Sequence, residues 1–247
     1  PQDAEQLVAL LLHFNPRFLS WWQSEGEALS RSGLVHFESL LQQKTLPSFL
    51  SQVGRFYEAE LTPESLLAFN FMARPQSPEN TSNGEQIESQ SVVEIVAGKA
   101  PGDKLDVVVH ELCHYLYRRS PAEAEQRLLQ WFASQPGPEA IVAYNLLNEV
   151  LATSIGNALI NQWQMSPSDF QKYVKNPRAL YNDPWIAPVA KAVYPRVQRA
   201  LDTGESLYSV AFLNDYLRLT RQTLGAEARH PVPLLRTMAA AYTPETR

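Results

Sequence analysis

Cysteine is almost absent from this sequence, and so are several features that would assign it to a broad class of proteins. Cys113 is the single cysteine among 247 residues, which excludes an intramolecular disulfide framework. No apolar run approaches the roughly 18 residues that a membrane-spanning helix needs. Positive charge is not in excess either, because the formal net charge is -5, so the composition gives no basic footprint for nucleic acid or an anionic membrane.

What the chain does contain is enough apolar material for a sizeable core. Hydrophobic residues make up 45% of it and charged residues 19%, which excludes a wholly disordered protein. No stretch is long or flexible enough to act as a domain linker. We therefore expect one domain over residues 1–247, with N-terminal helices in 1–62, a sheet and the metal-binding helices in 63–160, and a helical part in 161–247.

Hydrophobic periodicity predicts mostly helix, with a short β region. The first helix has an apolar face with spacings of three and four, and we expect it to end before Pro16. That face consists of Leu7, Leu10, Leu11 and Phe14. The apolar run 66–72 and the β-branched run 92–96 predict two strands that pair antiparallel, with residues 75–90 as a loop. The expected fold class is α+β, mainly helical, with a small antiparallel sheet.

The segment 105–119 carries the clearest chemical motif. Its residues 110–114 read HELCH, which is the H-E-x-x-H pattern. On a helix, His110 and His114 lie one turn apart on one face, where two imidazoles can bind the same zinc ion. Glu111 is placed to reach a metal-bound water and to take its proton as general base. Cys113 points away from that face, so we interpret it as a buried, small apolar residue.

A catalytic zinc site needs a third protein ligand and an open position for water. The predicted helix 144–160 carries one acid, Glu149, on its apolar face. A carboxylate among apolar side chains is costly unless it is paired or binds a metal, which favours Glu149 as the ligand. Glu123 and Glu125 are nearer to the histidines in sequence, but they lie in a charged, Ala-rich stretch that is typical of a solvated helix face.

These residues resemble the gluzincin zinc metallopeptidases. HELCH at 110–114, followed by NEVLA at 148–152, is similar to the two zinc-binding motifs of that clan, and the resemblance covers about residues 90–160. It implies zinc held by His110, His114 and Glu149, and an edge strand before the zinc helix that pairs with peptide substrates, for which 92–96 is the candidate. Two features depart from the pattern. Glu149 follows His114 by 35 residues, and Thr153 stands where thermolysin-like enzymes have an acid.

The departure at Thr153 leaves the partner of the zinc-bound histidines open. Thr153, a backbone carbonyl or a distant aspartate would each serve as the acceptor that such a histidine needs. The resemblance also implies a distant tyrosine or histidine that stabilises the oxyanion of the reaction. The candidates are Tyr208, Tyr216 and His230, although both tyrosines also fit the apolar pattern of a helix core.

The leading hypothesis is a zinc-dependent metallopeptidase with one zinc ion per chain, Glu111 as general base and a peptide or protein as substrate. The alternatives are a non-catalytic zinc-binding or regulatory module derived from a peptidase, and a helical interaction protein with structural histidines. An intact Glu111 argues against a purely structural site. The oligomeric state stays open, and a bacterial periplasmic or envelope location is favoured over the cytoplasm because peptidases of this size often work outside the cytosol.

Overall fold

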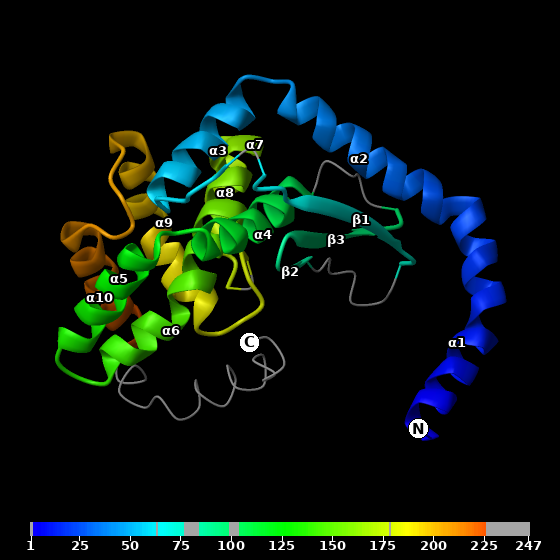
Figure 1. Cartoon of the computed structure of the whole chain (residues 1–247). Coiled ribbons are helices and arrows are strands. Elements are labelled where there is room, and N and C mark those ends of the chain that lie inside the picture. The colour runs from blue at the N-terminus through cyan, green and yellow to red at the C-terminus, as the bar shows by residue number, and fades with distance from the viewer. Residues whose placement is uncertain (1, 63, 77–83, 99–103, 178, 226–247) are drawn as a thin grey trace.

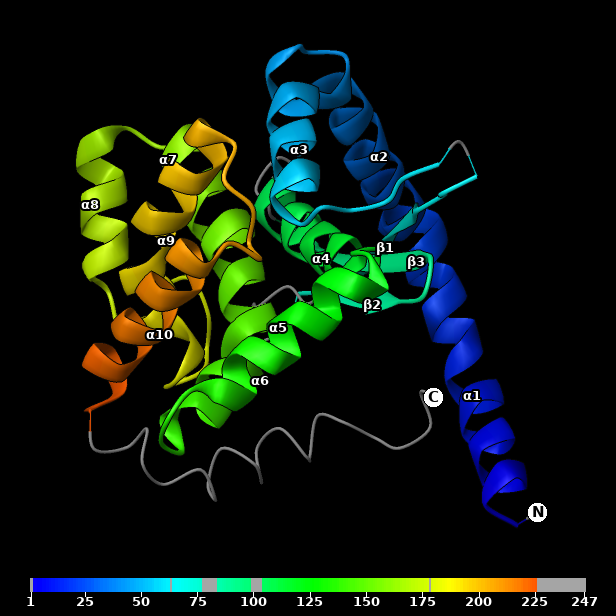
Figure 2. The ribbon, with the colours of Figure 1, turned by 60° about the vertical axis from the view of Figure 1, so that its left-hand side comes forward.

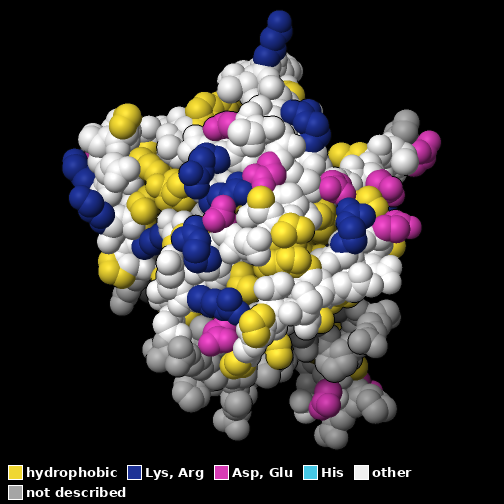
Figure 3. Space-filling view, turned by 90° about the vertical axis from the view of Figure 1, so that its left-hand side faces the viewer, with side chains coloured by type: hydrophobic (Ala, Val, Ile, Leu, Met, Phe, Trp, Pro, Cys, Tyr) yellow, Lys and Arg dark blue, Asp and Glu magenta, His cyan; other side chains and the backbone are white. Residues whose placement is uncertain are grey.

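A computed structural model describes residues 2–62, 64–76, 84–98, 104–177 and 179–225 of the chain (Figure 1). It is 71% helical and contains a three-stranded sheet, so the mainly helical α+β class is confirmed. Within the described residues, no helix is both long and apolar enough to cross a membrane. On the face shown in Figure 3, basic and acidic side chains are interspersed.

The N-terminal region forms a long helical arm and a shorter helix. The arm consists of α1 (Gln2–Trp21), a π-helical turn η1 (Trp22–Gly26) and α2 (Glu27–Leu41), and it is followed by α3 (Thr45–Phe56). The prediction that Pro16 ends the first helix is wrong, because α1 continues through it. Proline lacks the N–H of one backbone hydrogen bond, but its fixed φ is compatible with a helix. Figures 1 and 2 both show α1 projecting away from the other helices.

The sheet consists of β1 (Ala68–Arg74), β2 (Gly84–Ile87) and β3 (Gln90–Val96), in the order β1-β3-β2. β3 pairs with β1 in parallel and with β2 antiparallel, so the sheet is mixed rather than antiparallel as predicted. The run 92–96 is therefore central and not an edge strand. The sequence prediction missed β2, because its four residues lie inside a tract rich in turn-forming residues.

One face of the sheet is covered by two helices. α2 lies over β1 and β3, where a Cβ on Gly33 would clash with Ile95 and the ring of Phe37 contacts Phe69 and Phe71. α4 (Leu105–Arg118) packs beside β2 and β3. Because β3 side chains alternate between the faces, Val93 and Ile95 are buried there while Glu94 is only half-buried.

The helical body lies beyond α4 (Figure 2). It comprises α5 (Ala122–Ser134), α6 (Glu139–Ala152), a π-helical segment η3 (Thr153–Leu159), α7 (Ile160–Gln164), α8 (Pro167–Lys175), α9 (Ile186–Thr203) and α10 (Val210–Leu224). α4 packs against α6 and η3, and these in turn pack against α9. The motif helix is thus held between the sheet and the hydrophobic core, which includes Val109, Leu147, Ile155, Val193 and Phe212.

Candidate metal centre

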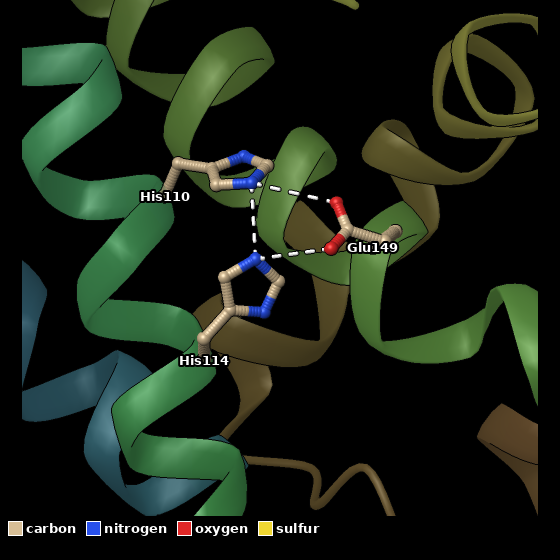
Figure 4. A group of neighbouring side chains, drawn as sticks. All are labelled: His110, His114 and Glu149. Carbon is tan, nitrogen blue, oxygen red and sulfur yellow. Dashed lines mark hydrogen bonds and ion pairs between the residues drawn. The ribbon is translucent and has the colours of Figure 1, made fainter. Parts of the chain in front are cut away.

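Three side chains that carry potential metal-ligand atoms converge between α4 and α6. His110 and His114 project from successive turns of α4 and Glu149 projects from α6 (Figure 4). The two Nε2 atoms are 3.1 Å apart, Glu149 Oε1 lies 3.3 Å from His114 Nε2, and Oε2 lies 3.6 Å from His110 Nε2. Both histidines are buried. Sequence reasoning named these three residues as ligands, and the structure brings them together.

Two asparagines fix the orientation of the imidazole rings. His110 Nδ1 lies 2.9 Å from Asn157 Oδ1, and His114 Nδ1 lies 3.1 Å from Asn148 Oδ1. An amide oxygen is an acceptor only, so each Nδ1 carries a hydrogen and each ring turns its Nε2 toward Glu149, where the neutral form of the ring presents a lone pair. The asparagines therefore supply the acceptors that the sequence left open, and neither is one of the three candidates considered there.

Asp106 holds the amide of Asn157 in the orientation that this arrangement needs. The half-buried carboxylate of Asp106 hydrogen-bonds the side chains of Asn157 and Asn161, and it accepts from the backbone N–H of Val107. Burial raises the pKa of Asp106, and these hydrogen bonds oppose that shift. Since Asp106 takes the N–H of Asn157, the oxygen of that amide faces His110. A chain of hydrogen bonds thus connects Asp106 to the cluster of His110, His114 and Glu149, which is called the metal cluster below for the ion that it could hold.

The π-helical geometry of η3 places Asn157 beside the metal cluster. In a regular α-helix, a residue eight positions after Glu149 is rotated by about 80° from it. A π-helical segment takes one extra residue into its turn, which brings Asn157 back to the face that carries Glu149. Gly156 permits the close contact, because a Cβ there would lie 2.5 Å from the backbone nitrogen of His110 and 2.7 Å from the carbonyl oxygen of Asp106.

The cluster is strongly coupled electrostatically. Burial raises the pKa of Glu149, but its interactions with His110, His114 and Tyr181 outweigh burial and lower it to about 2. Burial lowers the pKa of His110, yet its interaction with Glu149 reverses the sign, so the net shift is upward. For His114, burial prevails over Glu149 and the pKa falls. Glu149 is thus ionised and supplies one negative charge beside two imidazoles.

The donor set fits a metal ion. Two lone pairs and a carboxylate face one another, and Glu149 Oε2 is buried without a hydrogen bond in the described structure. A tetrahedral ion with ligand bonds of about 2.0–2.1 Å has ligand atoms separated by about 3.3–3.4 Å, close to the three distances observed. His110, His114 and Glu149 could therefore hold a metal ion.

Glu111 lies between the metal cluster and β2. It is 5% exposed, and a Cβ on Gly84 would clash with its carboxylate and with Val107, so Glu111 packs closely against the start of β2. Burial raises the pKa of Glu111 to about 7, with His110 opposing the shift and the charges of Glu149 and Glu85 adding to it. A carboxyl group with this pKa exchanges its proton readily near neutral pH.

Tyr181 completes the surroundings of the cluster, and sequence reasoning missed it. Its ring stacks on His110, with centroids 5.7 Å apart and an interplanar angle of 10°. Its hydroxyl hydrogen-bonds Glu149, which helps to lower the pKa of that carboxyl, while burial raises the pKa of Tyr181 itself. Tyr181 belongs to the irregular segment between α8 and α9, where no periodic pattern indicates which side chains point inward.

The other predicted residues lie elsewhere. The Tyr216 hydroxyl is fully buried and donates to the carbonyl oxygen of Ala143, and the Tyr208 hydroxyl hydrogen-bonds Ser120 just after α4. The described contacts give neither tyrosine a partner in the metal cluster, and His230 lies outside the described residues. Glu123 and Glu125 are exposed, as predicted, and Cys113 is buried, as predicted.

A sequence signal for Asn157 did exist. Gly156 stands in the middle of a predicted helix, and a glycine there often marks a close approach to another backbone. The neighbouring Asn157 was therefore a candidate for contact with the motif helix. Whether it faces the same side of its helix as Glu149 depends on the π-helical turn, which the sequence does not reveal.

Searches against protein-family models, curated proteins and solved structures returned no match to this chain. The assignment of a metal centre therefore depends on the geometry of the described residues.

Proposed function

We propose that this protein is a zinc-dependent metallopeptidase of gluzincin type. The observation that carries the proposal is the convergence of two Nε2 lone pairs and one carboxylate, with a buried carboxyl of raised pKa immediately beside them. Two imidazoles and one carboxylate form a typical ligand set of catalytic zinc sites, which leave a further position for water. When bound, zinc would polarise a scissile carbonyl and acidify the attacking water.

Glu111 performs the proton transfers in this proposal. It accepts a proton from the attacking water and passes it to the leaving amine, and its pKa of about 7 suits both directions of transfer near neutral pH. A merely structural metal site has no use for such a group, which is why the peptidase is favoured over the non-catalytic module.

β2 takes the role that the sequence assigned to residues 92–96. Among the described strands it pairs on one side only, with β3, and its first residue, Gly84, lies against Glu111. An extended peptide that adds to its other side would pass beside the general base. In such a peptide only every second backbone amide would hydrogen-bond β2. We therefore expect N-methylation of those amides to reduce kcat/KM at least about tenfold, and N-methylation of the amides between them to change it little.

We favour Tyr181 over Tyr208 and Tyr216 as the oxyanion stabiliser, and His230, which lies outside the described residues, stays a candidate. Its hydroxyl reaches Glu149, so it is a donor beside the position where the scissile carbonyl would lie. Tyr181→Phe should lower kcat about 10²–10³-fold, leave KM little changed and retain the metal. Metal loss in this variant would show that the hydroxyl supports the site rather than the reaction.

The deciding experiment combines metal analysis with turnover. The purified chain should contain about one zinc ion, removable by a chelator, and should cleave members of a broad fluorogenic peptide library. Glu111→Gln should keep the zinc and lose at least about a hundredfold in turnover. A chain that takes up no zinc refutes the metal centre, whereas a zinc-loaded chain that cleaves no peptide favours the non-catalytic module.

A further inference from the structure

The helix α1 exposes an apolar surface that the described part of the chain does not cover. Every side chain from Asp3 to Ser20 is exposed. The extensive contacts of α1 within the described residues are with η1, the next turn of the same helical arm. Figures 1 and 2 show the rest of α1 lying away from the helical body. Large exposed apolar patches of this kind mark sites of interaction, so we expect this surface of α1 to be covered by a partner.

The apolar residues of α1 form a seam with the spacing of a coiled coil. Intervals of three and four alternate along it without a break, which is the a/d pattern that two-stranded helical packing uses. The seam consists of Ala4, Leu7, Leu11, Phe14, Phe18 and Trp21. Pro16 falls at the f position of this heptad, on the side away from a partner helix, so it does not interrupt the seam.

The size of the surface matches a second helix of the same kind. Six large apolar side chains of α1 lie at the a, d, e or g positions of this heptad and are between 49% and 60% exposed: Leu7, Val8, Leu10, Leu11, Phe14 and Phe18. At roughly 80–100 Å² each they offer about 500–600 Å² per partner, so two copies together reach the ~1,000 Å² that a specific interface needs. A copy of this chain brings an equal surface of the same shape.

The charges of α1 favour an antiparallel partner. The acidic residues Asp3 and Glu5 lie in its first turns, and the basic residue Arg17 lies near its other end. An antiparallel copy places the acidic end of each helix beside Arg17 of the other, whereas a parallel copy places like charges together. A single arginine against two acids is a poor match for an anionic membrane, because interfacial helices carry several basic residues on the polar face.

We propose that two copies of this chain associate through antiparallel pairing of their α1 helices along this seam. The interface is isologous, so one helix supplies both halves of it. The proposal does not depend on the metal centre, since α1 contributes no residue to that site.

Sedimentation velocity of the full chain at about 10–100 μM tests the association. We expect a dimer, and Leu11→Glu should weaken it at least about tenfold because it places a carboxylate in the seam. Ile141→Glu is the matched control, since Ile141 is 56% exposed on α6 and Leu11 is 60% exposed on α1. Circular dichroism and a cooperative melt should show that both variants fold.

Charge reversal tests the orientation of the two helices. Arg17→Glu alone and Asp3→Lys with Glu5→Lys should each weaken the dimer, while an equimolar mixture of the two variants should restore a heterodimer. A monomer at 100 μM, a dimer insensitive to Leu11→Glu, or a mixture that stays monomeric would each overturn the proposal. So would a monomer that sediments with anionic phosphatidylglycerol vesicles but not with neutral phosphatidylcholine vesicles.

Discussion

The helix α1 and the helix formed by α6 with η3 have similar apolar sequence patterns, but α1 is exposed and η3 is buried. Both carry apolar side chains at intervals of three and four. Every residue of η3 is buried, whereas every described side chain of α1 up to Ser20 is exposed. The difference lies in the neighbours: η3 packs against α4 and α9, while α1 meets only η1 to any extent among the described elements. An apolar stripe predicts that a helix needs a partner, but it does not identify one.

The same contrast separates the two π-helical segments. In η1 only Gly26 is buried. In η3 the wider turn places Asn157 against His110, and Gly156 lets the two backbones approach. A π-helical turn is thus tied to a chemical site only where a second helix lies against it.

The largest effect should come from removing the ligand that α6 contributes. Glu149→Ala leaves two imidazoles, which should weaken zinc binding at least about a thousandfold, more than the loss of a supporting residue costs. A metal titration followed by calorimetry measures it. Glu123→Ala, on an exposed face of α5, should bind zinc like the parent. Equal affinity in the Glu149 and Glu123 variants would remove Glu149 from the site.

The second largest effect should come from disrupting the close contact between η3 and α4. Gly156→Ala places a methyl group against the backbone of His110, which cannot move without shifting α4, so we expect a loss of about 2–4 kcal/mol in unfolding free energy. Gly54→Ala is the matched control, because nothing lies within 4 Å of a Cβ there in α3. That variant should gain about 0.5–1 kcal/mol, since alanine favours a helix. Chemical denaturation of the metal-free proteins compares the two, and similar stabilities would contradict the packing.

The raised pKa of Glu111 should be visible as a pH-dependent stability of the metal-free protein. Its pKa is about 7 in the folded state and 4.5 as its ordinary value, so the folded state binds the proton more tightly. The folding stability that protonated Glu111 contributes is fully present below about pH 4.5 and is lost as the pH rises through 7. Glu111→Gln should therefore stabilise the chelated protein by up to about 3 kcal/mol at pH 8 and by much less at pH 5. An equal gain at both pH values would refute the shift.

The smallest expected effect concerns the residue that the π-helical turn supplies. Asn157→Ala removes the acceptor that fixes the His110 ring, and such changes cost about 10–100-fold in metal affinity. Asn161→Ala is a useful comparison, since the side chain of Asn161 hydrogen-bonds Asp106 rather than a histidine in the described structure, and its loss should cost less metal affinity. If both variants bind zinc like the parent, the hydrogen bond that His110 donates to Asn157 does not orient the ring.

The chemistry of the candidate site was largely available from local sequence. Residues 110–114 fix two imidazoles one helical turn apart wherever a helix forms, and the apolar context of Glu149 indicates an acid that needs a cation. The strand 92–96 was also predicted, but its predicted place at the edge of an antiparallel sheet was wrong. Pairing partners and strand direction depend on which segments meet in the fold. The strand β2 is too short and too polar to give a recognisable strand pattern in the sequence.

The local sequence is enough to predict that a helix carries His110, Glu111 and His114, that the chain is mainly helical, and that the first helix has an apolar face before Pro16. These features depend on spacing along a single helix, which is set by local backbone geometry. Packing in three dimensions, in contrast, surrounds the cluster with Asn157, Asn148 and Tyr181, makes β3 the central strand and leaves α1 exposed. Those features depend on distances between segments far apart in the chain, and the packing of the whole core sets them.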